Sequence, residues 1–265
     1  MLTIAVKAAR EAGKIINRAS QDVGSIKIQT KTYNDFVSDV DRAAEQAIIS
    51  VLKDAYPDHG FLGEESGESN QQADNIWIID PLDGTTNFLH SFPQYCISIA
   101  LQQKGVLTQA VIYDPVRNDL FTATKGRGAF LNDKRIRVTN RSKLQDSLIA
   151  TGFPFRDFTH LETYLNMLRD MIKKTTGIRR PGSAALDLAY VAVGWVDGFF
   201  EINLSAWDIA AGGLIVQEAG GIVGDFEGNE SWLKTGNIVA ANPKVFAQIL
   251  QTLSTHLTDD LKTPK

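Results

Sequence analysis

The 265-residue sequence has few of the cysteines and histidines that stabilise small secreted or zinc-binding domains. It contains a single cysteine, Cys96, so no intrachain disulfide can form, and its four histidines do not cluster into a structural zinc site of the usual kind. The longest apolar stretch, Ala189–Val196, is interrupted by Gly194 and ends at Asp197, so it is too short to cross a membrane. These absences predict a protein of a reducing, cytoplasmic compartment without membrane contact.

The chain also lacks an excess of basic charge. It has 27 basic and 31 acidic residues, a formal net charge of -4, which gives no global reason to bind nucleic acid or an anionic membrane. With 43% hydrophobic and 22% charged residues, the composition is that of an ordinary globular protein that buries a sizeable core. Any contact with an acidic partner must therefore be local.

The hydrophobic pattern changes along the chain. Helical spacing predicts two amphipathic helices near the start, and period-two patterns then predict a meander of strands, followed from about Ser147 by alternating strands and helices. The predicted helices lie at 4–16, 38–56, 162–173, 183–193 and 208–219, and the strands at 76–79, 96–101, 106–113, 120–124, 135–138, 148–150 and 198–202. We expect a mixed α/β fold, with an α+β half over residues 1–140 and an α/β half over 141–265. No long Gly, Ser or Pro linker separates them, so residues 1–265 are expected to form one unit.

The most informative segment is Trp77–Asn87, where a buried strand is expected to deliver Asp80 at its carboxyl end and Asp83 follows three residues later. Pro81 fixes a backbone dihedral between them, so the turn can hold both carboxylates and the Leu82 carbonyl at one point. Hard oxygen ligands of this kind select Mg²⁺ rather than zinc. The alternative interpretation is a plain turn, with Asp83 or Thr85 capping a short helix.

Further carboxylates stand in comparable places. Glu64 and Glu65 lie in the loop Gly63–Ser66, and Asp208 and Asp41 each fall in the first turn of a predicted helix. Each has an ordinary explanation, as a solvated acid or as an acid that favours a helix start. A metal site therefore depends on whether the fold brings these acids together.

At this point the chain resembles the Mg²⁺-dependent, lithium-sensitive inositol monophosphatases, and bacterial members in particular. The motifs that carry the resemblance are Asp35–Asp41, Gly63–Ser66, Trp77–Phe88, Ala150–Phe155, Gly182–Ala185, Gly198–Glu201, Trp207–Gly212 and Gly220–Gly221. They occur in the expected order over nearly the whole length. The resemblance implies the layered αβαβα sandwich of the inositol monophosphatase and fructose-1,6-bisphosphatase superfamily, and a homodimer.

The resemblance also implies roles for individual residues, with two or three Mg²⁺ ions per site. The implied metal ligands are Glu64, Asp80, the Leu82 carbonyl, Asp83 and Asp208. The implied catalytic set is Asp41, Glu64 and Thr85, in which Asp41 and Thr85 orient the attacking water. The implied substrate-binding set is Asp83, Gly84, Thr85, Gly182, Ser183, Ala184, Glu201 and Asp208.

The reaction implied is hydrolysis of inositol 1-phosphate by a water that the metal activates. Two alternatives stay open. One is another small phosphate ester, such as fructose bisphosphate, a phosphoadenosine nucleotide or NADP. The other is an interaction protein of the transcription elongation and antitermination machinery in ribosomal RNA synthesis, because Lys125–Lys143 carries seven basic residues against one acid. That segment also fits a strand with one solvated face.

Overall fold

The computed structural model describes residues 1–26, 28–32, 35–155 and 157–262, and it describes no side chains at 25, 28–32, 35–37, 260 and 262. Asp35, Phe36 and Val37 of the first family motif therefore lie outside the described side chains. The helices are α1 (Leu2–Ala19), α2 (Asp39–Ala55), α3 (Thr85–Leu89), α4 (Leu161–Lys174), α5 (Ala184–Val193), α6 (Ala206–Glu218), α7 (Trp232–Thr235), α8 (Pro243–Leu253) and α9 (Asp259–Lys262), with 3₁₀ turns at Ser20–Ser25, Leu144–Asp146 and Ser254–His256.

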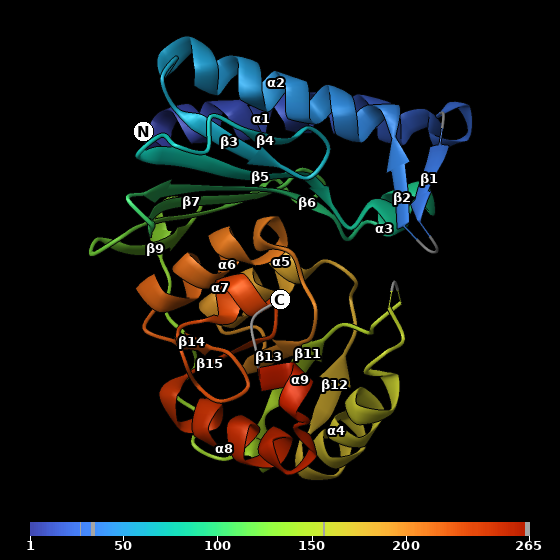
Figure 1. Cartoon of the computed structure of the whole chain (residues 1–265), viewed down its shortest axis with the longest axis vertical. Coiled ribbons are helices and arrows are strands. Elements are labelled where there is room, and N and C mark those ends of the chain that lie inside the picture. Colours follow the sequence, from blue (N-terminus) through green and yellow to red (C-terminus); the bar gives the residue numbers. More distant parts are fainter. Residues whose placement is uncertain (27, 33–34, 156, 263–265) are drawn as a thin grey trace.

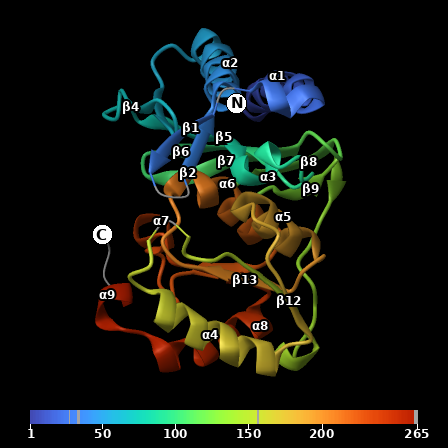
Figure 2. The same ribbon diagram turned by 90° about the vertical axis from the view of Figure 1, so that its right-hand side faces the viewer.

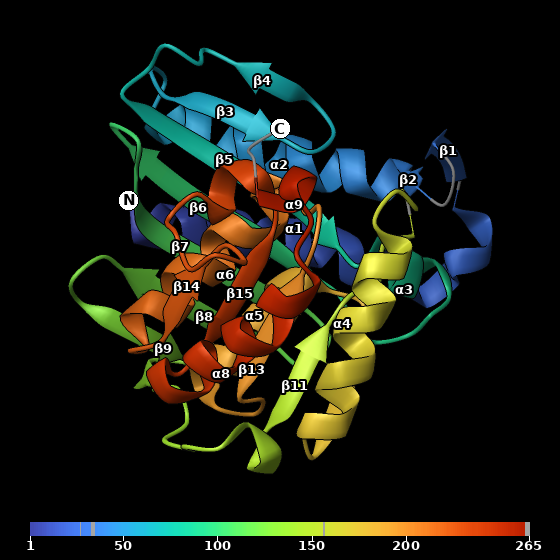
Figure 3. The same ribbon diagram turned by 60° about the horizontal axis from the view of Figure 1, so that its bottom comes forward.

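The helices and two of the sheets form five layers (Figures 1 and 2). Helices α1 and α2 cover the outer face of a large sheet, α5 and α6 lie between this sheet and a smaller one, and α4 and α8 cover the far face of the smaller sheet (Figure 3). This arrangement confirms the predicted αβαβα sandwich.

The large sheet has the strand order β10-β9-β8-β7-β6-β5-β3-β4 within the described residues. Its strands are β3 (Gly60–Gly63), β4 (Gly67–Ser69), β5 (Asn75–Asp83), β6 (Cys96–Gln103), β7 (Val106–Asp114), β8 (Asp119–Thr124), β9 (Gly128–Leu131) and β10 (Lys134–Arg135). All neighbours pair antiparallel except β3 and β5, which pair in parallel. The antiparallel strands β6, β7 and β8 match the predicted meander.

The smaller sheet is mixed, with the order β12-β11-β13-β15-β14 in the described part of the chain. Its strands are β11 (Leu148–Thr151), β12 (Gly177–Arg179), β13 (Gly198–Glu201), β14 (Ile222–Gly224) and β15 (Ile238–Ala241), and a separate hairpin pairs β1 (Ile28–Thr32) with β2 (Asp35–Ser38). Strands β11 and β13 are parallel neighbours, and both end at the cleft between the two halves, where Thr151 and Glu201 line a cavity.

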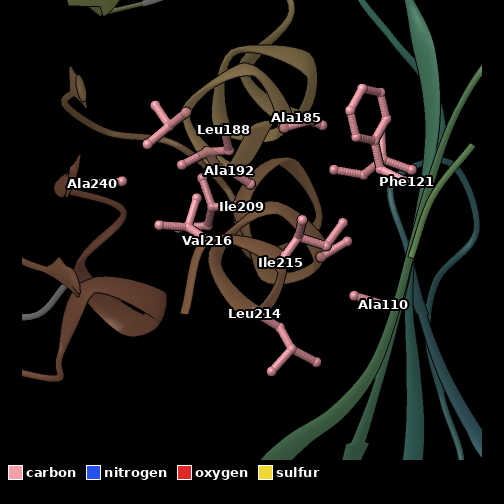
Figure 4. Packing of buried hydrophobic residues seen from close by; sticks show 14 of the residues in the cluster. Ala110, Phe121, Ala185, Leu188, Ala192, Ile209, Leu214, Ile215, Val216 and Ala240 are labelled. Carbon is pink, nitrogen blue, oxygen red and sulfur yellow. The ribbon is translucent and has the colours of Figure 1, made fainter. Parts of the chain in front are cut away.

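The central helices α5 and α6 are apolar on all sides because a sheet covers each face of their layer. Leu188 and Ile209 lie within this layer, which packs against Phe121 of the large sheet on one side and Ala240 of the small sheet on the other (Figure 4). Gly212 lets the two helices approach closely, since a Cβ there would lie 2.5 Å from the Cβ of Leu188. The middle layer thus joins the two halves through one continuous core.

Two differences from the predicted elements stand out. The expected strand at 135–138 is wrong beyond Arg135, because β10 comprises only Lys134–Arg135. Strand β9 was not among the predicted strands. Strands of two to four residues are too short for a period-two pattern to emerge. No helix in the described part of the chain combines the length and hydrophobicity needed to span a bilayer.

Candidate active site

A cavity of about 400 Å³ opens where the two halves of the chain meet. Its wall contains every residue predicted for the site except Asp41, together with residues that were not predicted. The predicted residues in the wall are Glu64, Asp80, Leu82, Asp83, Gly84, Thr85, Gly182, Ser183, Ala184, Glu201 and Asp208. Residues separated by more than 140 positions in the sequence are thus gathered around one space.

Strand β5 places Asp80 and Asp83 through a bulge. Its pairing with β6 is regular up to Asp80 opposite Ser98 and resumes with Asp83 opposite Cys96, so two residues, Pro81 and Leu82, stand against one. In a regular strand, residues three apart point to opposite faces, and the extra residue of a bulge restores a common face. Pro81 has no N–H to lose from the ladder, which suits it to this position.

Helix α6 brings the third acid to the same point. One carboxylate oxygen each from Asp80, Asp83 and Asp208 lies within 4.8 Å of the others. Asp208 does cap its helix, because Ser205 N–H donates to its Oδ2 at 2.7 Å, but that contact uses only one of its two oxygens. One side chain therefore both caps its helix and belongs to the acidic cluster.

Burial and the neighbouring carboxylates together raise the pKa of Asp80. Burial raises its pKa well above the usual value, and the charges of Glu64, Asp83 and Asp208 raise it further, while a hydrogen bond from Leu82 N–H to Oδ1 at 2.9 Å lowers it. A set of carboxylate oxygens under mutual repulsion fits a hard divalent cation, which relieves that repulsion on binding. The residues present therefore fit Mg²⁺.

Glu64 enters the site from the loop after β3. Its N–H donates to the Ile79 carbonyl at 3.1 Å, which fixes the loop beside β5. The next two N–H groups, of Glu65 and Ser66, donate to the Glu45 carboxylate at 3.0 and 2.7 Å. Glu45 is 2% exposed and lies one helical turn after Asp41 on α2. Sequence reasoning missed Glu45, for which the spacing of four residues from Asp41 was the only available signal.

Asp41 reaches the cavity through Thr85. Thr85 Oγ1 has two acceptors within reach of its single hydrogen, Asp41 Oδ1 at 2.9 Å and the Leu82 carbonyl at 3.0 Å, and the carboxylate is the stronger acceptor. The other oxygen of Asp41 accepts the N–H and the hydroxyl of Ser38, the N-cap of α2. Burial raises the pKa of Asp41, and the hydrogen bonds from Ser38 and Thr85 lower it. The two residues predicted to orient water are thus in direct contact.

Asp83 is anchored to the start of α5. Its Oδ2 accepts the Ser183 hydroxyl at 2.6 Å and the Ala185 N–H at 2.8 Å. Ser183, which was predicted to face the substrate, therefore gives its proton to a predicted metal ligand. Asn87, which was in the motif without an assigned role, donates to the carbonyls of Pro181 and Gly182 and so ties α3 to the segment before α5.

The wall of the cavity also contains Glu201 at the end of β13 and Gly152 after β11. A Cβ at Gly152 would lie within 2.2 Å of the Glu201 carboxylate oxygens, so glycine is required there for Glu201 to occupy its place. The same wall includes Phe153, Arg180 and Asp187, none of which was predicted.

Comparison with known proteins agrees with this geometry. The sequence profile of the inositol monophosphatase family matches residues 1–258. The Nus factor SuhB of Pseudomonas aeruginosa is 52% identical over 267 residues, which cover 99% of this chain and 98% of that protein. The chain therefore belongs to the inositol monophosphatase family.

Two solved structures show how far the likeness extends. The crystal structure of extragenic suppressor protein SuhB from Bartonella henselae has a TM-score of 0.93 and 45% identity, covering 96% of this chain and 98% of that one. The inositol monophosphatase of Anabaena sp. PCC 7120 has a TM-score of 0.83 and 35% identity, covering 96% and 95%. Relatives at this level of similarity thus include proteins named for a phosphatase activity and proteins named as Nus factors.

Proposed function

We propose that the chain is a Mg²⁺-dependent phosphomonoesterase that hydrolyses inositol 1-phosphate to myo-inositol and phosphate and is inhibited by lithium. The observation that carries this proposal is the cluster of Asp80, Asp83 and Asp208 at one end of the cavity, with the Asp41–Thr85 pair beside it. Family membership and the solved inositol monophosphatase neighbour support the same reaction class.

Two or three Mg²⁺ ions would be held by Glu64, Asp80, the Leu82 carbonyl, Asp83 and Asp208. When bound, they supply the positive charge that a phosphate monoester requires in an acidic pocket. They also lower the pKa of water, which makes it a better nucleophile toward phosphorus.

The water is oriented by Thr85 and Asp41. Thr85 Oγ1 donates its hydrogen to Asp41, so its lone pairs accept a hydrogen bond from the water. As the water attacks, its proton passes to Thr85 Oγ1 and the Thr85 hydroxyl proton passes to the Asp41 carboxylate. The backbone N–H groups of Gly84 and Thr85, at the start of α3, bind phosphate oxygens. Gly182, Ala184 and Glu201 bind hydroxyl groups of the inositol ring.

A panel of phosphate esters tests the proposal. We expect Mg²⁺-dependent phosphate release from inositol 1-phosphate, suppressed by lithium, at a kcat/KM well above that for fructose 1,6-bisphosphate, 3′-phosphoadenosine nucleotides and NADP. Release that is faster from one of these other esters would reassign the substrate within the family. Release that does not depend on Mg²⁺ would contradict the metal site itself.

Two further properties belong to this proposal. We expect a homodimer, which sedimentation velocity would detect, and a cytoplasmic location. Neither property is required by the chemistry of the cavity, so a monomer would leave the proposed reaction unchanged.

A second function is favoured by the Nus factor name of the Pseudomonas relative and by the basic segment. All seven basic side chains between Lys125 and Lys143 are exposed. Some have internal contacts, since Arg141 pairs with Asp197 at 3.1 Å and Arg137 donates to the Glu218 carbonyl. We propose that this face contacts an acidic surface of the transcription elongation machinery.

The test is binding of the chain to a purified transcription elongation complex at increasing salt. Charge reversal at Lys125, Arg127 and Lys134 is expected to weaken binding and its salt dependence while phosphate release is unchanged. Charge reversal at Lys7 and Lys53, on the far outer helices, is the control. Binding that is equally strong in both variants would contradict a role for the basic segment.

A further inference from the structure

Asp187 is a buried carboxyl group in the wall of the cavity that the proposed reaction does not use. It lies on α5, one turn after Ser183, and is 1% exposed. Its Oδ1 has no hydrogen-bond partner among the described residues. Leaving a buried polar atom unpaired costs about 1–3 kcal/mol, and such atoms in native proteins call for an explanation. At the wall of a ligand cavity, the natural explanation is a partner that arrives with the ligand.

Neither the helix dipole nor an ion pair explains why the unpaired oxygen of Asp187 is buried. An acid in the first turn of a helix gains roughly 0.3–1 kcal/mol from the helix dipole, which is less than the cost of the unpaired oxygen. Arg180 lines the same cavity, but its guanidinium lies over the rings of Phe155 and Phe153, at 4.8 and 5.4 Å from their centres. Among the described residues, no ion pair joins Arg180 to Asp187.

The surroundings define what Asp187 can bind. Burial raises the pKa of Asp187 well above the usual value, and the charges of Glu201 and Asp83 raise it further. Arg180 lowers this pKa. A carboxyl group that keeps its proton both donates and accepts hydrogen bonds, as a hydroxyl group does. Glu201 shares this part of the cavity wall. Two acids there match a neutral ligand rich in hydroxyl groups and repel a second phosphate.

We propose that Asp187 is a specificity-determining residue whose carboxyl group hydrogen-bonds a hydroxyl group on the alcohol portion of the substrate. An ester without a hydroxyl group at that point leaves the buried carboxyl group unpaired, so Asp187 discriminates against it. This inference rests on the proposed phosphatase function and adds Asp187 to the residues that determine its specificity.

The experiment compares inositol 1-phosphate with phenyl phosphate, whose alcohol portion carries no further hydroxyl group. For each ester, kcat/KM is measured at saturating Mg²⁺ in the wild type, Asp187→Leu and Asp187→Asn. Leu has the same branching at Cγ as Asp but is larger and cannot hydrogen-bond, whereas Asn matches Asp in size and keeps both a donor and an acceptor. We expect Asp187→Leu to lower the ratio of kcat/KM for inositol 1-phosphate to that for phenyl phosphate by roughly 10-fold. Asp187→Asn is expected to retain the ratio within about 3-fold.

The outcomes separate this inference from the function on which it rests. An Asp187→Leu variant that slows both esters equally, or neither, contradicts the specificity role while leaving the phosphatase proposal intact. A kcat/KM ratio that falls in Asp187→Asn as much as in Asp187→Leu also contradicts the specificity role, since hydrogen bonding by residue 187 would then not determine the preference. A wild type that releases phosphate from neither ester contradicts the phosphatase function, and the specificity role of Asp187 with it.

Discussion

Three aspartates of the candidate site are held in place by hydrogen bonds from neighbouring parts of the fold. Asp41 uses one oxygen at the N-cap of α2 and the other for Thr85, Asp83 is fixed through Oδ2 by Ser183 and Ala185, and Asp208 is fixed through Oδ2 by Ser205. Each side chain is thereby oriented before any ligand arrives. Such preorganisation is what a metal and phosphate site requires.

Asp80 provides a prediction about stability. Its pKa is raised in the folded state by burial and then by Glu64, Asp83 and Asp208, so the metal-free folded protein binds more protons than the unfolded chain. The stability that protonated Asp80 contributes is fully present below the pKa of the unfolded chain, about 4. It is lost as the pH rises through the higher pKa of the folded state. At pH 7 we expect Asp80→Asn to raise the free energy of unfolding of the metal-free protein, on the order of 1 kcal/mol.

Thermal unfolding at pH 5 and pH 8, with and without Mg²⁺, measures this effect. Mg²⁺ should stabilise the wild type more at pH 8 than at pH 5 and should stabilise Asp80→Asn little at either pH. A metal-free Asp80→Asn protein that is less stable than the wild type at pH 8 would show that repulsion among the acids is not the dominant effect.

Ser183 provides a prediction about activity. Ser183→Ala removes the 2.6 Å hydrogen bond to Asp83 and leaves only the Ala185 N–H to hold Oδ2. Loss of a partner behind a metal ligand typically costs about 10- to 100-fold in metal affinity or activity. We therefore expect weaker Mg²⁺ binding, visible as a higher half-saturating Mg²⁺ concentration for phosphate release. Ser183→Thr, which keeps the hydroxyl group, is the matched control, and equal losses in both variants would refute the positioning role.

At the scale of elements, the site depends on the bulge in β5 and on one face of α2. The bulge turns Asp80 and Asp83 to the same side of the sheet, and α2 presents Asp41 and Glu45 one turn apart. Asp41 acts through Thr85, and Glu45 holds the loop that carries Glu64. Helix α2 therefore positions two different parts of the site at once.

Glu45→Gln tests the second of these roles. The change keeps the size of the side chain but places an N–H₂ group against the N–H of Glu65 or Ser66, so the loop with Glu64 loses one anchor. We expect the half-saturating Mg²⁺ concentration to rise roughly 10-fold, with kcat at saturating Mg²⁺ largely retained. Calorimetric Mg²⁺ titration is an independent readout, and Glu68→Gln, at an exposed position on β4, is the control. An unchanged Mg²⁺ affinity would contradict the role given to Glu45.

Much of this element structure could be predicted from the sequence, for physical reasons. Ser38 and Gly194 bound α2 and α5 as expected, because capping chemistry is local. The bulge at Pro81 and the role of Glu45 could not be predicted, because each depends on a partner strand or loop about 20 residues away. Asp187 was missed for the same reason: its lack of a partner is a property of the packed cavity and not of the sequence around it.

At the scale of the whole molecule, α5 and α6 belong to the second half of the chain but pack against the sheet of the first half (Figure 4). The cavity lies at the same junction, with Asp80 and Asp83 contributed by the first half of the chain and Asp208 and Glu201 by the second. We propose that residues 1–265 fold as one unit for this reason, since neither half has a complete core or a complete site.

Leu188→Ala tests the shared core. Leu188 is fully buried and packs directly on α6 at Gly212, so its truncation is expected to cost about 2–5 kcal/mol of the free energy of unfolding. Hydrogen exchange in mild denaturant should show the protection of β6 and β15 falling together. Ile172→Ala, at a 58% exposed position on α4, should change stability by less than about 1 kcal/mol. Loss of protection in β15 alone would mean that the halves unfold separately.

The central claim is that the acids gathered at this junction bind Mg²⁺ for phosphate ester hydrolysis. Its most direct test is phosphate release from inositol 1-phosphate as Mg²⁺ is titrated into the wild type and Asp83→Asn side by side, with circular dichroism to show that both are folded. We predict Mg²⁺-dependent release by the wild type and a loss of at least roughly 100-fold in the variant, because a direct ligand matters more than the partners behind it. Near-normal release by Asp83→Asn would contradict the assignment of the site.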